Sequence, residues 1–309
     1  MPSAARAALT VLGTVGAVGA GAAIWGVGIE RYLFTVRHHA LRMLPPGSQP
    51  VRVLHVSDAH MAPWQHRKQR WIAGLAALRP DLVINTGDNL GHERGLEGLR
   101  EAFAPLRGIP GAFVHGSNDH ASPSPRNPLM YFSGPSKQVS SAEPLDTGAL
   151  DAYLGDELGW LSLNNAVGSL EAAGVRFDLF GISDAHRGWD RLDLLPDPVA
   201  AMRSGSTAAL TLGVTHAPYR RVLDEFTDLG ADVIFAGHTH GGQVRIPGSR
   251  SALVANCDIP LDQARGLSAW THDGRTAALN VSAGLGHSIY APVRFGCRPE
   301  ASLITLLPA

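Results

Sequence analysis

The sequence is poor in charge, in cysteine and in basic clusters, and these shortages exclude several classes of protein. Charged residues make up 17% of its 309 residues, and the net charge is −1. No run of Lys and Arg is interleaved with aromatic residues, so we expect no nucleic-acid partner. The two cysteines, Cys257 and Cys297, lack the spacing of metal ligands and are expected to be structural. A single pair leaves open whether they form a disulfide.

Charge is also missing near the N-terminus. No residue between Ala7 and Ile29 is charged, and a helix needs about 20 apolar residues to cross a bilayer. We therefore predict that residues 1–30 are the transmembrane anchor of a single-pass protein of the cell membrane. A cleaved signal peptide and a buried helix remain as alternatives. Basic residues flank the segment on both sides, so the positive-inside rule assigns no orientation.

The rest of the chain divides into a connector and one folded domain. Residues 31–50 are predicted to be a juxtamembrane linker that ends in a Pro-Pro-Gly turn. Its basic residues either contact anionic lipid headgroups or belong to a solvated connector. Residues 51–309 are long enough to bury one sizeable core and are predicted to form one domain.

Two histidines one residue apart are the most informative local feature. His238 and His240 stand between glycines, directly after the apolar run Val233–Ala236. If this run is a strand, the alternation of side chains sends both imidazoles to one side. Neutral imidazole is the commonest protein ligand of metal ions, and glycine lets the backbone approach a ligand closely. The pattern indicates a metal site if other segments supply further ligands; otherwise it is a polar turn.

Four other apolar runs end in the same way, with side chains of metal-ligand type at a loop marked by Gly or Pro. A single Asp at a strand end is ordinarily a turn former, so the ordered series carries the signal. In open α/β sheets, ligands gather at the carboxyl ends of strands, and we expect these side chains to converge. The groups are Asp58 with His60, Asp88, Asn118 with Asp119 and His120, and His216.

In order and spacing, these groups resemble the calcineurin-like metallophosphoesterase superfamily. The resemblance runs from about Val51 to Pro308 and includes the motif at residues 237–242. The tail at residues 293–300, followed by an apolar run, resembles the branch of that superfamily with an N-terminal membrane segment. By analogy with that branch, the catalytic domain is expected outside the cytoplasm.

The resemblance implies a role for each ligand. One metal ion takes Asp58, His60, Asp88 and His240, and a second takes Asp88, Asn118, His216 and His238, so that Asp88 bridges them. The chemistry agrees, because a carboxylate can span two cations, an amide oxygen is a neutral hard ligand, and imidazole suits zinc, iron and related ions. We expect two divalent ions of Mn, Fe or Zn. The lack of thiolate ligands argues against a structural zinc site.

The chain departs from the family pattern at one loop. Family members carry Gly-Asn-His followed by Asp or Glu, and that His is thought to protonate the leaving group or hold the phosphate. Here Asn118 is followed by Asp119, and His120 comes one residue late. Either Asp119 or His120 is then the catalytic residue, or activity is reduced. A general acid contributes about 10²–10⁴-fold, so its loss slows catalysis without abolishing it.

The pattern of apolar residues predicts the fold. Residues 67–78 and 219–229 have helical spacing and stand between strands, which indicates an α/β organisation. Later apolar runs follow one another with few helices between them. A two-sheet β-sandwich flanked by helices, preceded by one transmembrane helix, fits these patterns, and the family resemblance implies the same α+β fold.

Residues 121–160 form the least regular segment and open with several prolines beside the Asn118 loop. A long loop next to a catalytic centre is usually functional or disordered. We predict a substrate-facing cap with Arg126, Tyr131 and Lys137 as contacts; a surface loop is the alternative.

These inferences combine into one predicted activity, that of a membrane-associated, dinuclear-metal phosphoesterase, a hydrolase acting on ester bonds. It is expected to hydrolyse a phosphodiester, phosphomonoester or pyrophosphate by attack of a metal-bound hydroxide. An anchor brings the site near lipids, which favours a lipid-linked or envelope substrate. The alternative is a metal-binding module with little or no turnover, because the usual His is replaced at Asp119. A metallo-β-lactamase-type hydrolase is disfavoured, since its clustered His-x-His-x-Asp-His motif is absent.

Overall fold

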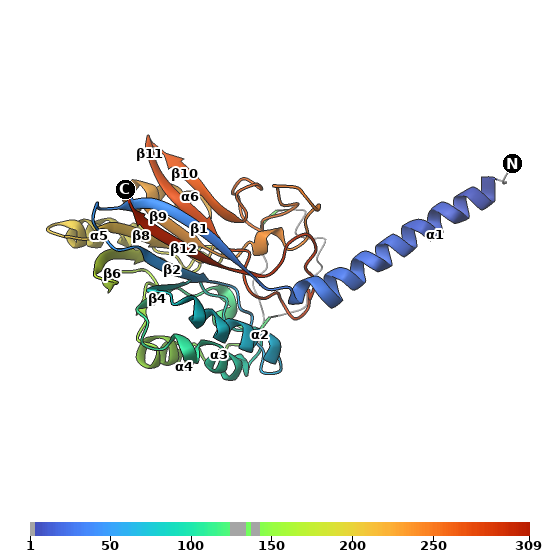
Figure 1. Cartoon of the computed structure of the whole chain (residues 1–309), viewed down its shortest axis with the longest axis horizontal. Helices are drawn as coiled ribbons and strands as arrows, with labels where there is room; N and C mark the ends of the chain where they lie inside the picture. Colours follow the sequence, from blue (N-terminus) through green and yellow to red (C-terminus); the bar gives the residue numbers. More distant parts are fainter. Residues whose placement is uncertain (1–3, 124–133, 137–142) are drawn as a thin grey trace.

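The computed structural model describes residues 4–123, 134–136 and 143–309. Within them the chain forms two six-stranded sheets that pack face to face, with helices on both outer faces (Figure 1). One long N-terminal helix projects away from this domain. The predicted sandwich with flanking helices and a preceding helix is therefore confirmed.

The first sheet is built around four parallel strands whose carboxyl ends lie at one edge of the sheet. A long strand, β12, pairs in antiparallel orientation with β2 on the side opposite β3. In spatial order the strands are β1 (Thr35–Leu44), β12 (Glu300–Pro308), β2 (Val51–Val56), β3 (Leu82–Asn85), β4 (Gly111–Phe113) and β5 (Leu161–Ser162).

The second sheet also has a parallel centre, with an antiparallel hairpin at each edge. Its order is β10 (Gly266–His272), β11 (Arg275–Val281), β9 (Val233–Ala236), β8 (Leu210–Val214), β7 (Val175–Gly181) and β6 (Ala166–Ala172). Parallel strands of both sheets end at the same side of the sandwich, so the loops that follow them meet there.

Apolar side chains fill the space between the sheets and the space under each helical layer. Val53, Phe177 and Phe235 between the sheets are fully buried. Burying each such side chain stabilises the folded state by about 1.5–3 kcal/mol. The predicted helical segments correspond to α2 and α6. The helices of the domain are α2 (His66–Ala73), α3 (Gly95–Phe103), α4 (Thr147–Asp151), α5 (Pro196–Arg203) and α6 (Arg220–Asp228).

The N-terminal helix is α1 (Ala4–Ala23), which continues through a π-helical segment at Ile24–Ile29. By length and composition, Leu9–Tyr32 is able to cross a membrane, and a secretory signal sequence shares these properties. At its base the Glu30 carboxylate accepts hydrogen bonds from the backbone N–H groups of Gly296 and Cys297, at 3.0 and 2.8 Å. The helix is therefore fixed to the domain at its C-terminal end.

Residues 31–50 differ from the expected linker, because they contain an edge strand of the first sheet. β1 pairs in parallel with β12 over its whole length, and Leu44 at its end is fully buried. Arg37 Nε donates to Glu300 Oε2 at 2.9 Å. The basic residues that suggested a headgroup contact lie on a strand that is buried on one side only, and their charge obscured its apolar alternation.

Two further predictions concern the cysteines and the contacts of the predicted cap. Cys257 and Cys297 are both buried and free, as expected of structural cysteines, and they form no disulfide. The predicted cap contacts Arg126, Tyr131 and Lys137 lie outside the described residues.

A pair of truncations tests the role of β1. A protein that begins at Glu30 keeps the strand, whereas one that begins at Pro45 loses it and leaves β12, nine residues long, as an exposed edge. We expect the shorter protein to precipitate or to melt at least about 5 °C lower by circular dichroism, since a few kcal/mol are lost. Equal melting temperatures would mean that residues 31–44 are a linker after all.

Candidate metal centre

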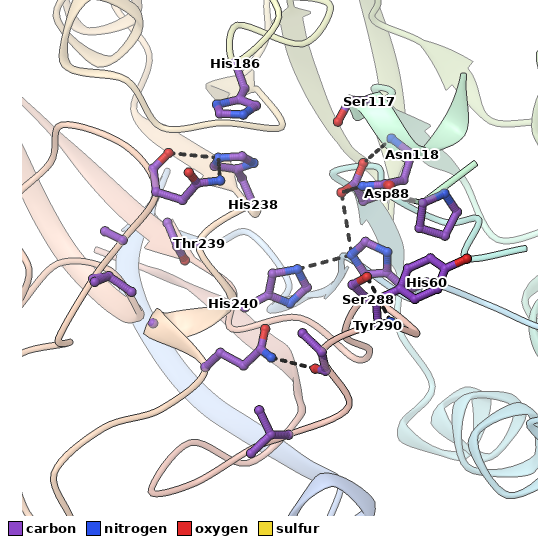
Figure 2. A pocket seen from close by; sticks show the side chains of 18 of the residues that line it. His60, Asp88, Ser117, Asn118, His186, His238, Thr239, His240, Ser288 and Tyr290 are labelled. Carbon is purple, nitrogen blue, oxygen red and sulfur yellow. Dashed lines mark hydrogen bonds and ion pairs between the residues drawn. The ribbon is translucent and has the colours of Figure 1, made fainter. Parts of the chain in front are cut away.

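All seven predicted ligand residues lie in loops that directly follow β2, β3, β4, β8 or β9. Five of them line a cavity of about 320 Å³ at this end of the sandwich: His60, Asp88, Asn118, His238 and His240 (Figure 2). The other two, Asp58 and His216, are fully buried behind them. The convergence expected from the sequence is therefore present in the structure.

The first group of candidate ligands consists of Asp58, His60 and His240, whose donor atoms lie within 4.8 Å of one another. His60 Nε2 is 3.1 Å from His240 Nε2, and the two rings face each other (Figure 2). His240 Nε2 is 3.5 Å from Asp58 Oδ1. Three donor atoms thus point at one common position.

The second group surrounds Asp88. His216 Nε2 is 3.6 Å from Asp88 Oδ2, and His238 Nδ1 is 3.3 Å from His216 Nε2. The Asn118 amide donates to Asp88 Oδ2 at 2.6 Å. Asp88 Oδ2 also lies 3.5 Å from His60 Nε2 of the first group. Asp88 is therefore the residue between the two groups, as expected of a bridging carboxylate.

The donor atoms fit divalent cations. Asp58 Oδ1 is buried and has no hydrogen-bond partner among the described residues, which is costly for a carboxylate oxygen unless a cation is bound there. Its other oxygen accepts from Ser57 Oγ at 2.5 Å and from the backbone N–H of His238 at 3.0 Å. A half-turn of the Asn118 amide would direct its oxygen to the position its nitrogen holds. Carboxylate, amide and imidazole together suit Mn, Fe or Zn.

Burial and neighbouring charges set the protonation of the carboxylates. Burial raises the pKa of Asp58 to about 7. Burial also acts to raise the pKa of Asp88, but His216, His60 and two hydrogen bonds from Asn118 outweigh it and hold this pKa below its ordinary value. Asp88 is therefore ionised at neutral pH, as a bridging ligand must be.

Burial also governs the imidazoles. It lowers the pKa of His60 to about 4 and brings the pKa values of His238 and His240 well below the ordinary value. These three rings are neutral at pH 7, which is the form that binds metal ions. His216 differs: burial acts to lower its pKa, but the carboxylates of Asp88 and others raise it to about 9.

Three of the imidazoles are oriented by hydrogen bonds on their outer nitrogens. His216 Nδ1 lies 2.7 Å from the Thr86 carbonyl, and His238 Nε2 lies 3.1 Å from the Asn256 carbonyl. His240 Nδ1 lies 3.1 Å from an Arg294 nitrogen. Each contact leaves the other ring nitrogen facing the centre, which is how outer partners fix the rotation of a metal-binding histidine.

The backbone that presents the ligands is not the strand end predicted for it. His238 and His240 have φ angles of 67° and 48°, and Asp58, His60 and Asp88 are also in the left-handed region. Strand alternation therefore does not explain why the two histidines face the same centre. Left-handed turns after the strands direct the two histidines to the centre instead. The left-handed conformation costs about 1–2 kcal/mol of conformational free energy for each such residue.

Glycine is required where this backbone passes the ligands. A Cβ on Gly237 would lie 2.0 Å from Ser57 Oγ and 2.5 Å from Asp58 Oδ2. A Cβ on Gly116 would lie 2.2 Å from Asp88 Oδ1. The close approach predicted for the glycines beside the histidines is thus met at Gly237.

Two buried cations that the sequence did not single out as buried support the ligand loops. Arg294 is fully buried and donates to the carbonyls of His240 and Ala283, at 2.9 and 2.8 Å. Lys68 is also buried, and its ammonium donates to the Ala59 carbonyl at 2.6 Å. Lys and Arg are mostly exposed in proteins, so no local pattern marks these two as internal.

The two predicted catalytic residues do not line the cavity. Asp119 is fully buried, and its carboxylate accepts hydrogen bonds from the backbone N–H groups of Asn89, Leu90 and Gly116. This position differs from the proton donor expected, because the carboxylate faces backbone amides. His120 is half-buried, with its Nδ1 3.2 Å from Thr147 Oγ1.

A histidine that the sequence reasoning missed does line the cavity. The rings of His186 and His238 are neighbours, with their centres 4.4 Å apart and their planes tilted by 42° (Figure 2). Its nitrogens lie 2.8 Å from Tyr219 Oη and 2.9 Å from Ser136 Oγ. The sequence does contain a pattern that indicates this histidine: Asp184 and His186 repeat after β7 the Asp-x-His pattern found after β2.

Known proteins resemble this chain in sequence and in fold. Two relatives are the uncharacterized metallophosphoesterase YkuE of Bacillus subtilis (strain 168), 23% identical over 95% of both chains, and the phosphodiesterase YaeI of Escherichia coli (strain K12), 23% identical over 89% of this chain and 88% of that one. Among solved structures, TT1561 of Thermus thermophilus has a TM-score of 0.43 and 10% identity, covering 77% of this chain and 91% of that one.

The family assignment rests on a match that spans more than half of the chain. Residues 51–242 match the family model for calcineurin-like phosphoesterases, and this range contains all seven candidate ligands. The chain belongs to the calcineurin-like phosphoesterase family and is a metal-dependent hydrolase.

Proposed function

We propose that this protein is a membrane-anchored phosphoesterase with two divalent ions, and that a phosphodiester is its first candidate substrate. One observation carries the proposal: Asp58 Oδ1, which has no hydrogen-bond partner among the described residues, lies near the donor atoms of His60 and His240, next to a second group joined through Asp88. A phosphodiesterase among the relatives supports the choice of ester. Phosphomonoesters and pyrophosphates are the alternatives.

The ligands divide as the family resemblance implies. Asp58, His60 and His240 would hold one ion, and Asn118, His216 and His238 the other, with Asp88 between them. When bound, the two ions supply Lewis-acid stabilisation of the phosphoryl oxygens and activation of a water. The chain itself fixes the ligands by the outer hydrogen bonds of its imidazoles and excludes water from Asp58 and His216 by burial.

The cavity wall beside the centre supports an ester with an apolar substituent. Ser117 and His186 line its polar side, next to Asn118 and His238 (Figure 2). Other lining residues are apolar, among them Val254 and Ala255. Together with the proposed anchor, this wall favours a lipid-linked phosphoester.

Single-ligand variants test the division of the metal ligands. His240→Ala should lose the ion shared with Asp58 and His60 first, and His238→Ala should lose the other, so each variant retains about one ion by elemental analysis. The control is His66→Ala, an exposed histidine at the start of α2 that contacts Gln69. If both ligand variants lose both ions, the two sites are not separable; if neither loses any, these histidines are not ligands.

Turnover separates the phosphoesterase from a metal-binding module. We expect the full chain with added Mn²⁺ to hydrolyse a generic aryl phosphodiester, and Asp88→Asn to abolish this activity because the charge between the two groups is lost. Measured release of the aryl alcohol at full metal occupancy decides the question. A protein that binds both ions without turnover would be the metal-binding module.

The replaced family histidine leads to a prediction about Asp119. Asp119→Ala leaves several buried backbone N–H groups without an acceptor, so the free energy of unfolding should fall by at least about 2 kcal/mol in urea titrations. His120→Ala should change turnover less than tenfold, because this side chain does not line the cavity. Unchanged stability in the first variant, or a larger loss of turnover in the second, would restore the catalytic role predicted from the sequence.

A further inference from the structure

Large apolar side chains are exposed around the mouth of the cavity. Val244, Leu253 and Tyr290 line it and are 37%, 40% and 50% exposed, and Ile246, beside Val244, is 60% exposed. These four residues are called the mouth rim below. Large apolar side chains that are exposed together at one site on a protein usually mark a contact with a membrane or another protein.

The mouth rim is joined to the base of the N-terminal helix by backbone contacts. Val244 forms a β-bridge with Phe295, and the backbone N–H of Arg294 donates to the Gly26 carbonyl at 3.1 Å. Gly26 packs so closely that a Cβ there would lie 3.0 Å from Val293 Cγ2. Because Glu30 also binds the backbone of the same loop, the rim and the helix base form one connected surface.

The depth of this junction places the rim at the level of the bilayer surface. Gly26 lies inside the apolar span Leu9–Tyr32, roughly 9 Å before its end at the helical rise of 1.5 Å per residue. The span of 24 residues is about 36 Å long and exceeds the hydrocarbon core of a bilayer by about 6 Å. Gly26 therefore lies at least about 3 Å inside the end of the hydrocarbon core, and a loop that contacts it lies at the boundary between the core and the headgroup layer. Figure 1 shows α1 leaving the domain on the side of these loops.

Charge on the two rim segments favours a membrane over another apolar surface. Neither residues 241–256 nor residues 285–299 contain an Asp or Glu, whereas Arg250 and Arg298 are exposed. An apolar patch with basic residues and an aromatic side chain, here Tyr290, is typical of proteins that lie on anionic lipid.

We propose that the mouth rim docks on the surface of the bilayer that holds α1, so that the cavity opens towards lipid headgroups. The occupant of this surface is an anionic membrane. The inference rests on the proposed anchoring and phosphoesterase activity and extends them: the site takes its phosphoester from the membrane.

Site-specific labels on the full chain in vesicles test the docking. Cys257 and Cys297 are buried, so an environment-sensitive fluorophore would attach to a new cysteine at Ile246→Cys, at Leu12→Cys within α1, or at Glu171→Cys on the distant β6–β7 hairpin. In vesicles of phosphatidylcholine and phosphatidylglycerol, a quencher attached to lipid should quench the labels at residues 246 and 12 several-fold more than the label at residue 171.

The outcomes separate the two proposals. If iodide in the aqueous phase quenches the label at residue 246 as strongly as the one at residue 171, while residue 12 is quenched from lipid, docking is wrong and anchoring stands. If residue 12 is not quenched from lipid either, both fail. If the label at residue 246 is protected from both quenchers, a protein surface covers the rim, and the membrane is not its partner.

Activity gives an independent measurement. Ile246→Ser does not touch the cavity, so turnover of a soluble aryl phosphodiester should be unchanged, while turnover of a phosphodiester lipid in the same vesicles should fall several-fold. Equal turnover of the lipid by both proteins would overturn the docking proposal. A wild-type protein without activity on either ester would overturn the phosphoesterase proposal instead, and the quenching result would still decide the docking.

Discussion

The structure depends on the burial of two carboxylates, Asp58 and Asp88, where the two sheets end. Two like charges out of water are unstable unless cations and hydrogen-bond donors surround them. Burial raises the pKa of Asp58 to about 7, so the charged form of this carboxylate is costly unless positive charge stands beside it. The histidines, the Asn118 amide and the metal ions that this family binds are the charges and donors that the pair requires.

The same constraint explains the unusual backbone around the site. Ligands from both sheets can meet at one point only if each chain turns inward directly after its strand, and left-handed residues achieve this turn in the shortest length. A hydrogen-bonded chain fixes the result from behind: Thr86 Oγ1 donates to Ser57 Oγ at 2.6 Å, and Ser57 Oγ donates to Asp58. His55 is fully buried, and its Nε2 lies 2.9 Å from Thr86 Oγ1. Strain at such a site persists because the surroundings over-determine it.

What the sequence predicts well is the set of ligands, because apolar strands that end in Asp, Asn or His are a local and repeated signal. It predicts poorly whatever depends on distant partners. The strand β1 is recognised only from its pairing with β12. Asp119 was predicted to be catalytic from its place in a motif, but a motif does not tell which way a side chain points. Arg294 and Lys68 are buried against carbonyl groups of ligand loops, which no spacing in the chain encodes.

Arg294 also contacts both the base of the N-terminal helix and the candidate metal centre, which are far apart in the sequence. Its backbone N–H binds Gly26 at the base of the N-terminal helix, and its guanidinium binds the carbonyl and contacts Nδ1 of His240. One residue therefore touches both the proposed anchor and a proposed metal ligand. Cys297 makes a second connection, because its backbone N–H donates to Glu30 and its thiol donates to the His240 carbonyl. The position of the helix and the geometry of the metal centre are thus parts of one packed unit.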